Sequence, residues 1–337
     1  MIEKFQGSEY IMHRYAGNPL LTVDDFPIPA QAVFNCGQTM YQGKTVLLIA
    51  AFYKESHHGS MTGIHVAMSD DGIHFTIEKE PLCSKRDWAG ECPGNFDCWV
   101  IDPRVTKIGD TYYIIRPAQT VDSGPAAVLE KTTDFKTCEF VSCVALPSNR
   151  VPSLFPEKIG DYYVRLDRPY NLHSEEEPEC IPDTDKLRAG MWISYSPDLI
   201  FWGKHKPLIY PEALPYANWK MGPTPPVKTK DGWLEIIHGV YKENGEFCYS
   251  IGAMLLDLQD PSKILGVLPH WILTPSAPYE QEGRVKNVVF PCGCIADEQT
   301  DTLRIYYGAA DTCIGLAQGS LRELVEACKN AGYSAGK

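Results

Sequence analysis

The sequence has no long apolar run and no excess of positive charge. No stretch approaches the ~18 consecutive apolar residues of a membrane-spanning helix. The first residues contain neither an apolar core nor a cleavage pattern, so we expect no signal peptide. The 31 Lys and Arg stand against 43 Asp and Glu, a formal net charge of −12. Because a basic face supplies most of the affinity for nucleic acid, this balance argues against nucleic acid and anionic membranes as partners.

Motifs for common cofactors and nucleophiles are absent as well. The chain has no nucleophile elbow, no Walker loop and no dinucleotide fingerprint. Its 12 cysteines are scattered and stand mostly in apolar contexts. The pairs Cys92/Cys98 and Cys292/Cys294 lack a His-x-x-x-His partner that would complete a zinc site. We therefore predict a cytoplasmic protein with reduced thiols and with no metal or organic cofactor.

Helical periodicity is rare and is clear only at the end of the chain. There Ser320 is a capping residue, Glu323 stands at the third helical position, and apolar residues follow at helical spacing. We predict a short C-terminal helix over about residues 320–331. The rest of the chain consists of short aromatic or β-branched segments separated by Gly, Pro, Asn and Asp, which predicts an all-β fold.

Two short motifs recur five times along the chain. The first is a turn followed by a strand, at 43–48, 109–113, 160–164, 231–236 and 301–306. The second is a strand that follows each of these, at 63–69, 126–132, 190–196, 250–256 and 312–317. Such a repeat predicts a five-bladed β-propeller that takes up residues 1–337 as one domain, because a divided propeller leaves sheet edges open. A β-sandwich is the alternative, but it does not require five copies of the same two motifs.

Catalytic and binding residues of a propeller usually lie at one end of its central channel, so polar residues in the first strand of each blade are the candidates. The stretch 97–105 is the most informative, since an apolar run leads to Asp102, then Pro103, then Arg104. Two residues apart in an extended segment, Asp102 and Arg104 should face the same space. They form either an acid–base site or an ordinary ion pair. The further candidates of this kind are Asn35, Arg165 or Arg168, His238 and Asp311.

Several of the candidates are basic. Arg165 and Arg168 stand three apart, and such positions of a strand face opposite ways, so at most one lines the channel. Lys220 lies in a loop shaped by Gly and Pro, and taken alone it is more readily interpreted as a surface lysine. His238 interrupts an apolar strand, where a hydrogen-bonded core histidine is the ordinary interpretation.

This set combines the aspartate of the Asp-Pro-Arg motif, Asp102, with Arg, Lys and His. Hydrolytic glycosidases generally need two carboxylates, one that protonates the leaving oxygen and one that activates water or attacks the sugar. Where cations replace the second carboxylate, a bound oxyanion such as phosphate can be the attacking group, and a single aspartate then suffices for acid–base chemistry.

The chain resembles glycoside hydrolase family 130, the β-mannoside phosphorylases and related β-mannosidases, from about residue 18 to the last helix. The motifs that carry the resemblance are Val33-Phe34-Asn35, Asp102-Pro103-Arg104-Val105-Thr106-Lys107-Ile108, Leu154-Phe155-Pro156-Glu157-Lys158, Asp167-Arg168-Pro169, Gly222-Pro223-Thr224-Pro225-Pro226, Ile237-His238-Gly239-Val240, Asn287-Val288-Val289-Phe290-Pro291-Cys292-Gly293 and Tyr306-Tyr307-Gly308-Ala309-Ala310-Asp311-Thr312. The family has a five-bladed propeller, in agreement with the repeat.

The resemblance also implies an activity and a set of roles. In the family's phosphorylases, an inverting reaction of a β-mannoside with inorganic phosphate gives α-mannose 1-phosphate and a shorter sugar. Asp102 matches the general acid, which passes its proton to the leaving oxygen through a hydroxyl of the mannosyl ring. Arg168, Lys220, His238 and Tyr249 match the phosphate-binding group, and the substrate-binding group is Asn35, Arg104, Arg150 and Asp311.

The hydrolytic branch of the family typically lacks the phosphate-holding cations, which this chain keeps. We therefore predict a phosphorylase with phosphate as co-substrate, and keep a β-mannosidase and a non-catalytic sugar-binding propeller as alternatives. The chain departs from the family at Ile101, where a glutamate is usual, and in the loop 52–59, which lacks a frequent arginine. The linkage (1,2, 1,3 or 1,4), the acceptor sugar and the oligomeric state stay open, although long loops would allow a homo-oligomer.

Overall fold

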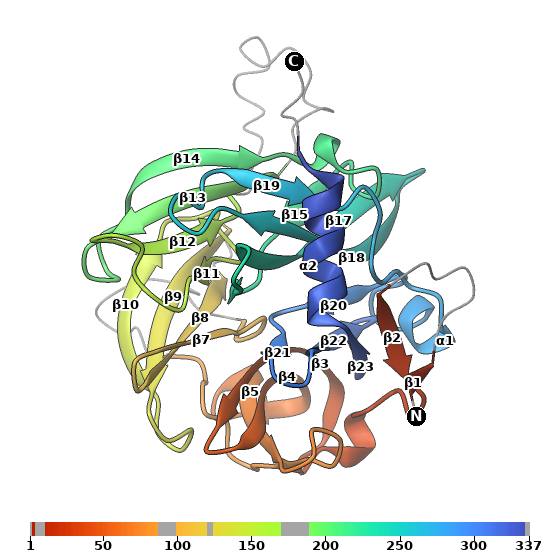
Figure 1. Cartoon of the computed structure of the whole chain (residues 1–337). Helices are drawn as coiled ribbons and strands as arrows, with labels where there is room; N and C mark the ends of the chain where they lie inside the picture. The colour runs from red at the N-terminus through yellow and green to blue at the C-terminus, as the bar shows by residue number, and fades with distance from the viewer. Residues whose placement is uncertain (1, 4–10, 87–98, 120–123, 170–188, 334–337) are drawn as a thin grey trace.

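The fold is seen in a computed structural model that describes residues 2–3, 11–86, 99–119, 124–169 and 189–333. Its strands form five antiparallel sheets arranged around a common centre, a five-bladed β-propeller (Figure 1). The predicted fold class is confirmed. In the described residues no helix is both long enough and apolar enough to cross a bilayer.

Blades 1 to 3 each contain four strands in simple up-and-down order. Blade 1 comprises β3 (Ala30–Tyr41), β4 (Lys44–His57), β5 (Ser60–Ser69) and β6 (Thr76–Ile77). Blade 2 comprises β7 (Arg104–Ile108), β8 (Thr111–Gln119), β9 (Pro125–Thr132) and β10 (Glu139–Ala145). Blade 3 comprises β11 (Ser153–Leu154), β12 (Tyr163–Asp167), β13 (Met191–Ser196) and β14 (Gly203–Ile209).

In blades 4 and 5 the first strand is split into two pieces that pair with the same neighbour. Blade 4 comprises β15 (Lys220–Gly222), β16 (Val227–Lys228), β17 (Trp233–Glu243), β18 (Glu246–Leu256) and β19 (Ile264–Val267). Blade 5 comprises β20 (Val289–Pro291), β21 (Ile295–Asp297), β22 (Thr302–Ala309), β23 (Cys313–Gly319), and from the other end of the chain β2 (Met12–Tyr15) and β1 (Ile2–Glu3).

The two repeated motifs are the second and third strands of each blade. The turn after the third strand is also repeated, in blades 1 to 4. It begins at an aspartate, and the Oδ1 atom of this aspartate accepts hydrogen bonds from two backbone N–H groups and so fixes the turn. This residue is Asp71, Asp134, Asp198 and Asp257 in blades 1 to 4.

The hydrophobic core lies between adjacent blades, with one main cluster at each of the five interfaces. The ring closes where β2 joins β23, and there Arg14 makes a two-pronged ion pair of 2.6 and 2.7 Å with Glu280 of the short helix α1 (Pro278–Gln281). Tyr307 Oη donates to the same carboxylate. A buried pair of this kind is costly to break, so it holds the N-terminal strand in the last blade.

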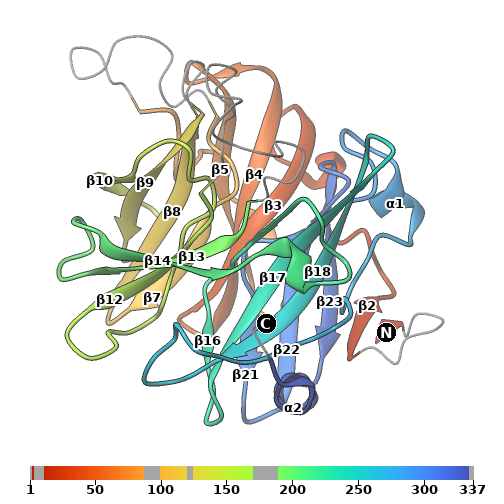
Figure 2. The ribbon, with the colours of Figure 1, turned by 90° about the horizontal axis from the view of Figure 1, so that it is seen from above.

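The C-terminal helix α2 (Leu321–Ala331) confirms the predicted helix, and its cap Ser320 accepts from the backbone N–H of Glu323. Seen from above, α2 lies at the lower edge of the propeller (Figure 2). Its side contacts the turns that precede β17 and β22, through Lys329 to Asp231 and Ser320 to Asp301. The described residues also contain two single turns of 3-10 helix, η1 (Val23–Asp25) and η3 (Pro211–Ala213).

Candidate active site

A pocket of about 280 Å³ opens at the end of the propeller opposite α2. At this end the first strands begin, the second strands end and the third strands begin, so the up-and-down order of every blade brings its loops here. The pocket is lined by Asn35, Trp99, Asp102, Arg150, Arg168, Lys220, Tyr249, Val285, Val288, Phe290 and Asp311. Seven of the nine residues that the sequence predicted thus meet in one cavity, and the other two, Arg104 and His238, lie behind it.

Two halves of the pocket come from contiguous blades. The carboxylate side, defined here as Asn35, Asp102 and Asp311, belongs to blades 1, 2 and 5. The cation side, defined here as Arg168, Lys220 and Tyr249, belongs to blades 3 and 4.

The expectation that site residues stand in first strands is only partly right. Asn35 lies on β3, and Asp102 stands just before β7. Arg168 follows the second strand β12, His238 lies on the second strand β17, and Asp311 follows the second strand β22. In an antiparallel blade the end of the second strand reaches the same edge as the start of the first, which explains the difference.

The carboxylate of Asp102 is buried and held from two directions. Asn35 Nδ2 donates to its Oδ1 at 2.7 Å, and Arg150 contacts its Oδ2 through Nε at 3.2 Å and Nη2 at 3.1 Å. Arg104 instead donates from Nη1 to the backbone carbonyl of Asp102 at 2.7 Å. The alternative of an Asp102–Arg104 ion pair is therefore wrong in its partner, because Arg150 takes that position.

The backbone of this side is unusual. Asn35, Asp102 and Asp311 all have positive φ angles, of 42°, 51° and 49°. Residues other than glycine seldom adopt this region, and such strain concentrates at functional sites. Gly308 makes the arrangement possible, because a side chain there would collide with Asn35.

The two aspartates are charged differently. Burial opposes ionisation of Asp102, but the guanidinium groups of Arg150 and Arg104 outweigh it and hold the pKa of this carboxyl below its usual value. Burial and the nearby Asp102 instead raise the pKa of Asp311 to about 6. In the free protein at neutral pH, Asp102 is thus ionised, whereas Asp311 titrates close to neutrality.

Arg168 brings a buried cation into the pocket. The backbone N–H of Arg168 donates to Asn149 Oδ1 at 3.1 Å. Arg165 pairs instead with Asp167 and does not line the pocket. Only one of the two candidate arginines therefore lines the cavity, as the strand geometry predicted. Burial and the neighbouring Arg150 and Arg104 lower the pKa of Arg168 to about 10, so it remains charged at neutral pH.

His238 supports Arg168 from behind. Its Nε2 lies 3.2 Å from Arg168 Nη1. Because a guanidinium only donates, this nitrogen accepts and the ring is neutral. Burial and the charge of Arg168 lower the pKa of His238 well below its usual value, which agrees with this state. A side chain at Gly222 would collide with this ring, so the glycine of the Gly-Pro-Thr motif makes room for it.

Lys220 begins β15, and its Nζ lies 5.0 Å from the ring centre of Tyr249, a cation–π contact. Burial and the charges of Arg168 and Arg150 lower the pKa of Lys220 to about 7. The cation side therefore holds like charges close together in a largely buried space, an arrangement that a bound oxyanion stabilises.

The remaining lining is apolar and was not singled out from the sequence. It consists of Trp99, Val285, Val288 and Phe290. The Trp99 ring stacks on the Phe52 ring, with 6.1 Å between the two centroids. The guanidinium group of Arg284 lies over the same Phe52 ring, 4.0 Å from its centroid. An aromatic wall beside polar groups is typical of a sugar-binding surface. Trp99 stands three residues before Asp102, and that proximity was the available signal.

Metal-ligating side chains do not gather in the pocket within the described ranges. The two groups of three that the described residues form are His57, His58 and Glu80, and Cys83, Glu130 and Cys138. The pair Cys92/Cys98, which the sequence argued against as a zinc site, lies outside the described residues. The nine cysteines that the structure describes are free thiols.

Comparison with known proteins adds to this geometry. The model of glycoside hydrolase family 130, described as β-1,4-mannooligosaccharide phosphorylase, matches residues 13–330. The chain belongs to this family. A β-1,4-mannooligosaccharide phosphorylase of Ruminococcus albus is 31% identical over 322 residues, which cover 95% of this chain and 91% of that one.

Two further matches, one in sequence and one in structure, come from Listeria innocua. A β-1,2-mannobiose phosphorylase is 37% identical over 273 residues, covering 80% of this chain and 70% of the relative. A solved structure of a β-1,2-mannobiose phosphorylase in complex with β-1,2-mannobiose is 29% identical, with a TM-score of 0.78 and coverage of 95% and 99% of the two chains. The family resemblance and the enzyme class, a glycoside phosphorylase, are confirmed.

Proposed function

We propose that the protein is an inverting β-mannoside phosphorylase. It cleaves a β-mannosyl disaccharide or oligosaccharide with inorganic phosphate and releases α-mannose 1-phosphate and a shortened sugar. The observation that carries the proposal is the pairing of one anchored carboxylate, Asp102, with a separate buried cation side in the same pocket. An inverting hydrolase needs a second carboxylate that activates water on the opposite face of the sugar from the acid. The second carboxylate of this pocket, Asp311, lies on the same side as Asp102, and the other side holds cations, which suit a phosphate nucleophile.

In this proposal the cation side positions phosphate. Arg168 and Lys220 bind phosphate oxygens, with Tyr249 beside them, and His238 keeps the Arg168 guanidinium in place. A phosphate oxygen attacks the anomeric carbon from the face opposite the leaving group. The new C–O bond forms as the glycosidic C–O bond breaks, so the configuration inverts. Because phosphate supplies the nucleophile, the reaction needs no metal or organic cofactor.

The leaving oxygen needs a proton, and Asp102 supplies it, through a hydroxyl of the mannosyl ring as in the family. The lowered pKa of Asp102 in the free protein means that it must first gain this proton. Bound phosphate adds negative charge near Arg150 and Arg168 and so opposes ionisation of the nearby carboxyl. Phosphate binding therefore prepares the acid as well as the nucleophile.

The acceptor part of the substrate lies against the apolar wall. Trp99 offers a ring face that is 41% exposed and is supported from behind by Phe52. Asp311 and Asn35 contact sugar hydroxyls in the neighbouring position. Relatives are named for both β-1,2- and β-1,4-mannosides, so the linkage and the acceptor sugar are to be identified by experiment.

The test is phosphorolysis of a panel of β-1,2-, β-1,3- and β-1,4-mannobioses, with and without phosphate. We expect mannose 1-phosphate in the α configuration to form only when phosphate is present. Phosphorus NMR detects this product. Release of free mannose at the same rate without phosphate would instead identify a β-mannosidase. Binding without turnover of any mannoside would identify a sugar-binding propeller. The reverse reaction, with mannose 1-phosphate and a set of acceptors, then identifies the acceptor sugar.

A further inference from the structure

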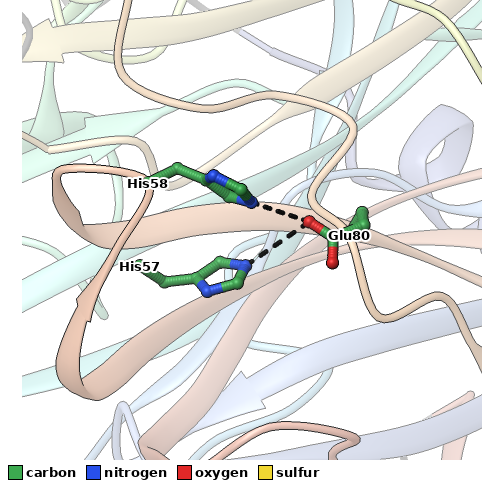
Figure 3. Close-up of side chains that lie close together, drawn as sticks. All are labelled: His57, His58 and Glu80. Atoms are coloured by element: carbon green, nitrogen blue, oxygen red, sulfur yellow. Dashed lines mark hydrogen bonds and ion pairs between the residues drawn. The ribbon is translucent and has the colours of Figure 1, made fainter.

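Three metal-ligating side chains converge at the tip of blade 1, outside the pocket described above. His57 ends β4, His58 stands in the turn to β5, and Glu80 lies on the segment that follows β6. Figure 3 shows both imidazole rings directed at one carboxylate oxygen of Glu80. The ligand atoms of the three residues all lie within 4.8 Å of one another.

The distances within this cluster leave one nitrogen without a hydrogen-bond partner. His58 Nε2 lies 2.7 Å from Glu80 Oε2, a normal hydrogen bond. His57 Nε2 lies 3.6 Å from the same oxygen, which is too far for one. This nitrogen is buried, and it has no hydrogen-bond partner in the described part of the chain. Buried polar atoms are nearly always paired, so an unpaired one that faces two other ligand atoms points to a bound group.

Two imidazole nitrogens and one carboxylate oxygen are typical ligands of Zn²⁺ and related divalent transition metals. We propose that His57, His58 and Glu80 form a binding site for one such ion, with Zn²⁺ as the reference metal. Tetrahedral coordination at bond lengths of about 2.0–2.1 Å places ligand atoms ~3.3 Å apart. The separations of 2.7 and 3.6 Å from Glu80 Oε2 bracket this value, and all the ligand atoms lie within 4.8 Å of one another.

The surroundings of the cluster favour a defined site. The His57 ring packs edge-on against Tyr53 at 5.4 Å between centroids. Tyr53 Oη is hydrogen-bonded to His65 Nε2 at 2.7 Å, and His65 Nδ1 is 3.0 Å from the carbonyl oxygen of Glu78. These bonds tie the segment of Glu80 to the β4–β5 hairpin. Outer residues that orient the ligands in this way add to metal affinity.

The fourth coordination position faces solvent. The side chain of His58 is 57% exposed and that of Glu80 is 64% exposed. Water would complete the coordination shell, and the ion would link the β4–β5 hairpin to the segment that follows β6. A metal at this place therefore stabilises the outer part of blade 1 and takes no part in phosphorolysis.

The second group, Cys83, Glu130 and Cys138, fits a metal less well. The carboxylate of Glu130 is already bound by Arg116, through Nε at 3.0 Å and Nη2 at 3.1 Å. The thiols of this group are nonetheless the principal competitor in any binding experiment, because thiolates are strong zinc ligands.

The experiment uses the full chain after treatment with a chelator, in reducing buffer, with ZnCl₂ and CoCl₂ as probes. Titration calorimetry and equilibrium dialysis give the stoichiometry and affinity, and cobalt absorption reports whether thiolate is a ligand. The variants are His57→Ala, His58→Ala, their combination and Glu80→Gln. His74→Ala is the matched control, since His74 pairs with Asp71 at 2.7 Å on the surface but has no second imidazole.

We expect about one equivalent of metal in the wild type, a cobalt spectrum without thiolate character, and a higher melting temperature with zinc. Each single variant should lose at least ~10-fold in affinity, the lower limit seen even for outer-shell changes. His74→Ala should bind like the wild type, and activity without metal should be the same in all variants. The proposal is overturned if the wild type binds no metal, if the double variant binds as before, or if the cobalt spectrum is that of a thiolate site.

Discussion

On the carboxylate side of the pocket the two carboxylate oxygens and the backbone carbonyl of Asp102 have partners, although Asn35 Oδ1 has none among the described residues. On the cation side, within the described part of the chain, Arg168 has an unpaired buried nitrogen, and so does His238 behind it. Asp102 accepts from Asn35 and Arg150 and its backbone carbonyl accepts from Arg104. In contrast, Arg168 Nε and His238 Nδ1 are buried without a hydrogen-bond partner among the described residues. Both sides belong to the same pocket, so general packing quality does not explain the difference.

The contrast teaches which side is complete before substrate arrives. Unpaired buried donors cost free energy, and a folded protein keeps them where a ligand later pairs with them. The cations also lower one another's pKa values, as in Lys220 and Arg168. The carboxylate of Asp102 is therefore prearranged by protein bonds, whereas the cation side depends on an anion to complete it. The first three predictions below each alter one of the two sides, and the fourth alters neither.

The largest effect is expected on the complete side. Asp102→Asn keeps the shape of the side chain and an oxygen that accepts from Asn35, but it removes the acidic group. The kcat for phosphorolysis should therefore fall at least ~100-fold. Steady-state kinetics on the β-mannobiose that the wild type prefers measures this loss. Since the cations are untouched, the phosphate KM should change much less than kcat.

An Asp102→Asn variant with near wild-type activity would contradict the role of Asp102. Asp71→Asn is a suitable control, because Asp71 fixes a surface turn after β5 through backbone hydrogen bonds and lies outside the pocket. Its kinetic constants should equal those of the wild type.

The next effect concerns the incomplete side. Arg168→Ala removes a charged donor to phosphate, and bonds to charged groups contribute about 1.5–3 kcal/mol. The phosphate KM should therefore rise roughly 10- to 100-fold, with a smaller change in the KM for the mannoside. Initial rates over a matrix of both substrates separate the two constants.

Arg165→Ala is the matched control for Arg168, since Arg165 is equally buried but pairs with Asp167 away from the pocket. It is expected to lower stability without a selective effect on phosphate. If Arg168→Ala leaves the phosphate KM unchanged, Arg168 does not belong to the anion site.

How much of this the sequence predicts depends on how local each feature is. Asp102, Pro103 and Arg104 form one short motif, so Asp102 was singled out directly as a candidate acid and does line the pocket, and the repeat of turns and strands predicted the five blades. The partner of Asp102 was assigned wrongly because Arg150 stands 48 residues away, and such pairings follow from the fold alone. The neutral state of His238 likewise depends on Arg168 from another blade.

The apolar wall escaped prediction for a related reason. Val285 and Phe290 enter the pocket from the segment before and within β20, where apolar residues are expected in any core strand. Only their position at the mouth of the propeller gives them a binding role, and a sequence pattern does not contain that position. Trp99 differs, since a large exposed aromatic residue near a candidate acid was a recognisable signal.

The third prediction uses pH to alter the cation side without a substitution. Lys220 has a pKa of about 7 in the free protein, because burial and its basic neighbours oppose its charge. Below this pH the ammonium is present and attracts phosphate, and above it the charged fraction falls about tenfold per pH unit. The value of kcat/KM for phosphate should therefore decrease as pH rises through 7 and beyond.

Lys220→Arg sharpens this test, because arginine keeps its charge throughout the range. Titration of phosphate itself affects both proteins equally, so the difference between their profiles isolates Lys220. Profiles that coincide would mean that the charge of Lys220 does not contribute to phosphate binding.

The smallest effect is expected where neither charged side is touched. Trp99→Ala removes the exposed ring of the apolar wall, and an aromatic contact contributes about 0.5–1.5 kcal/mol beyond its buried area. The KM for the acceptor sugar in the synthetic direction should rise roughly 2- to 10-fold, and Trp99→Phe should restore part of this loss. The KM for phosphate should stay the same, since Arg168 and Lys220 keep their surroundings. A rise in both constants would mean that Trp99 supports the whole pocket, because a residue that contacts only the acceptor has no means of changing the anion site.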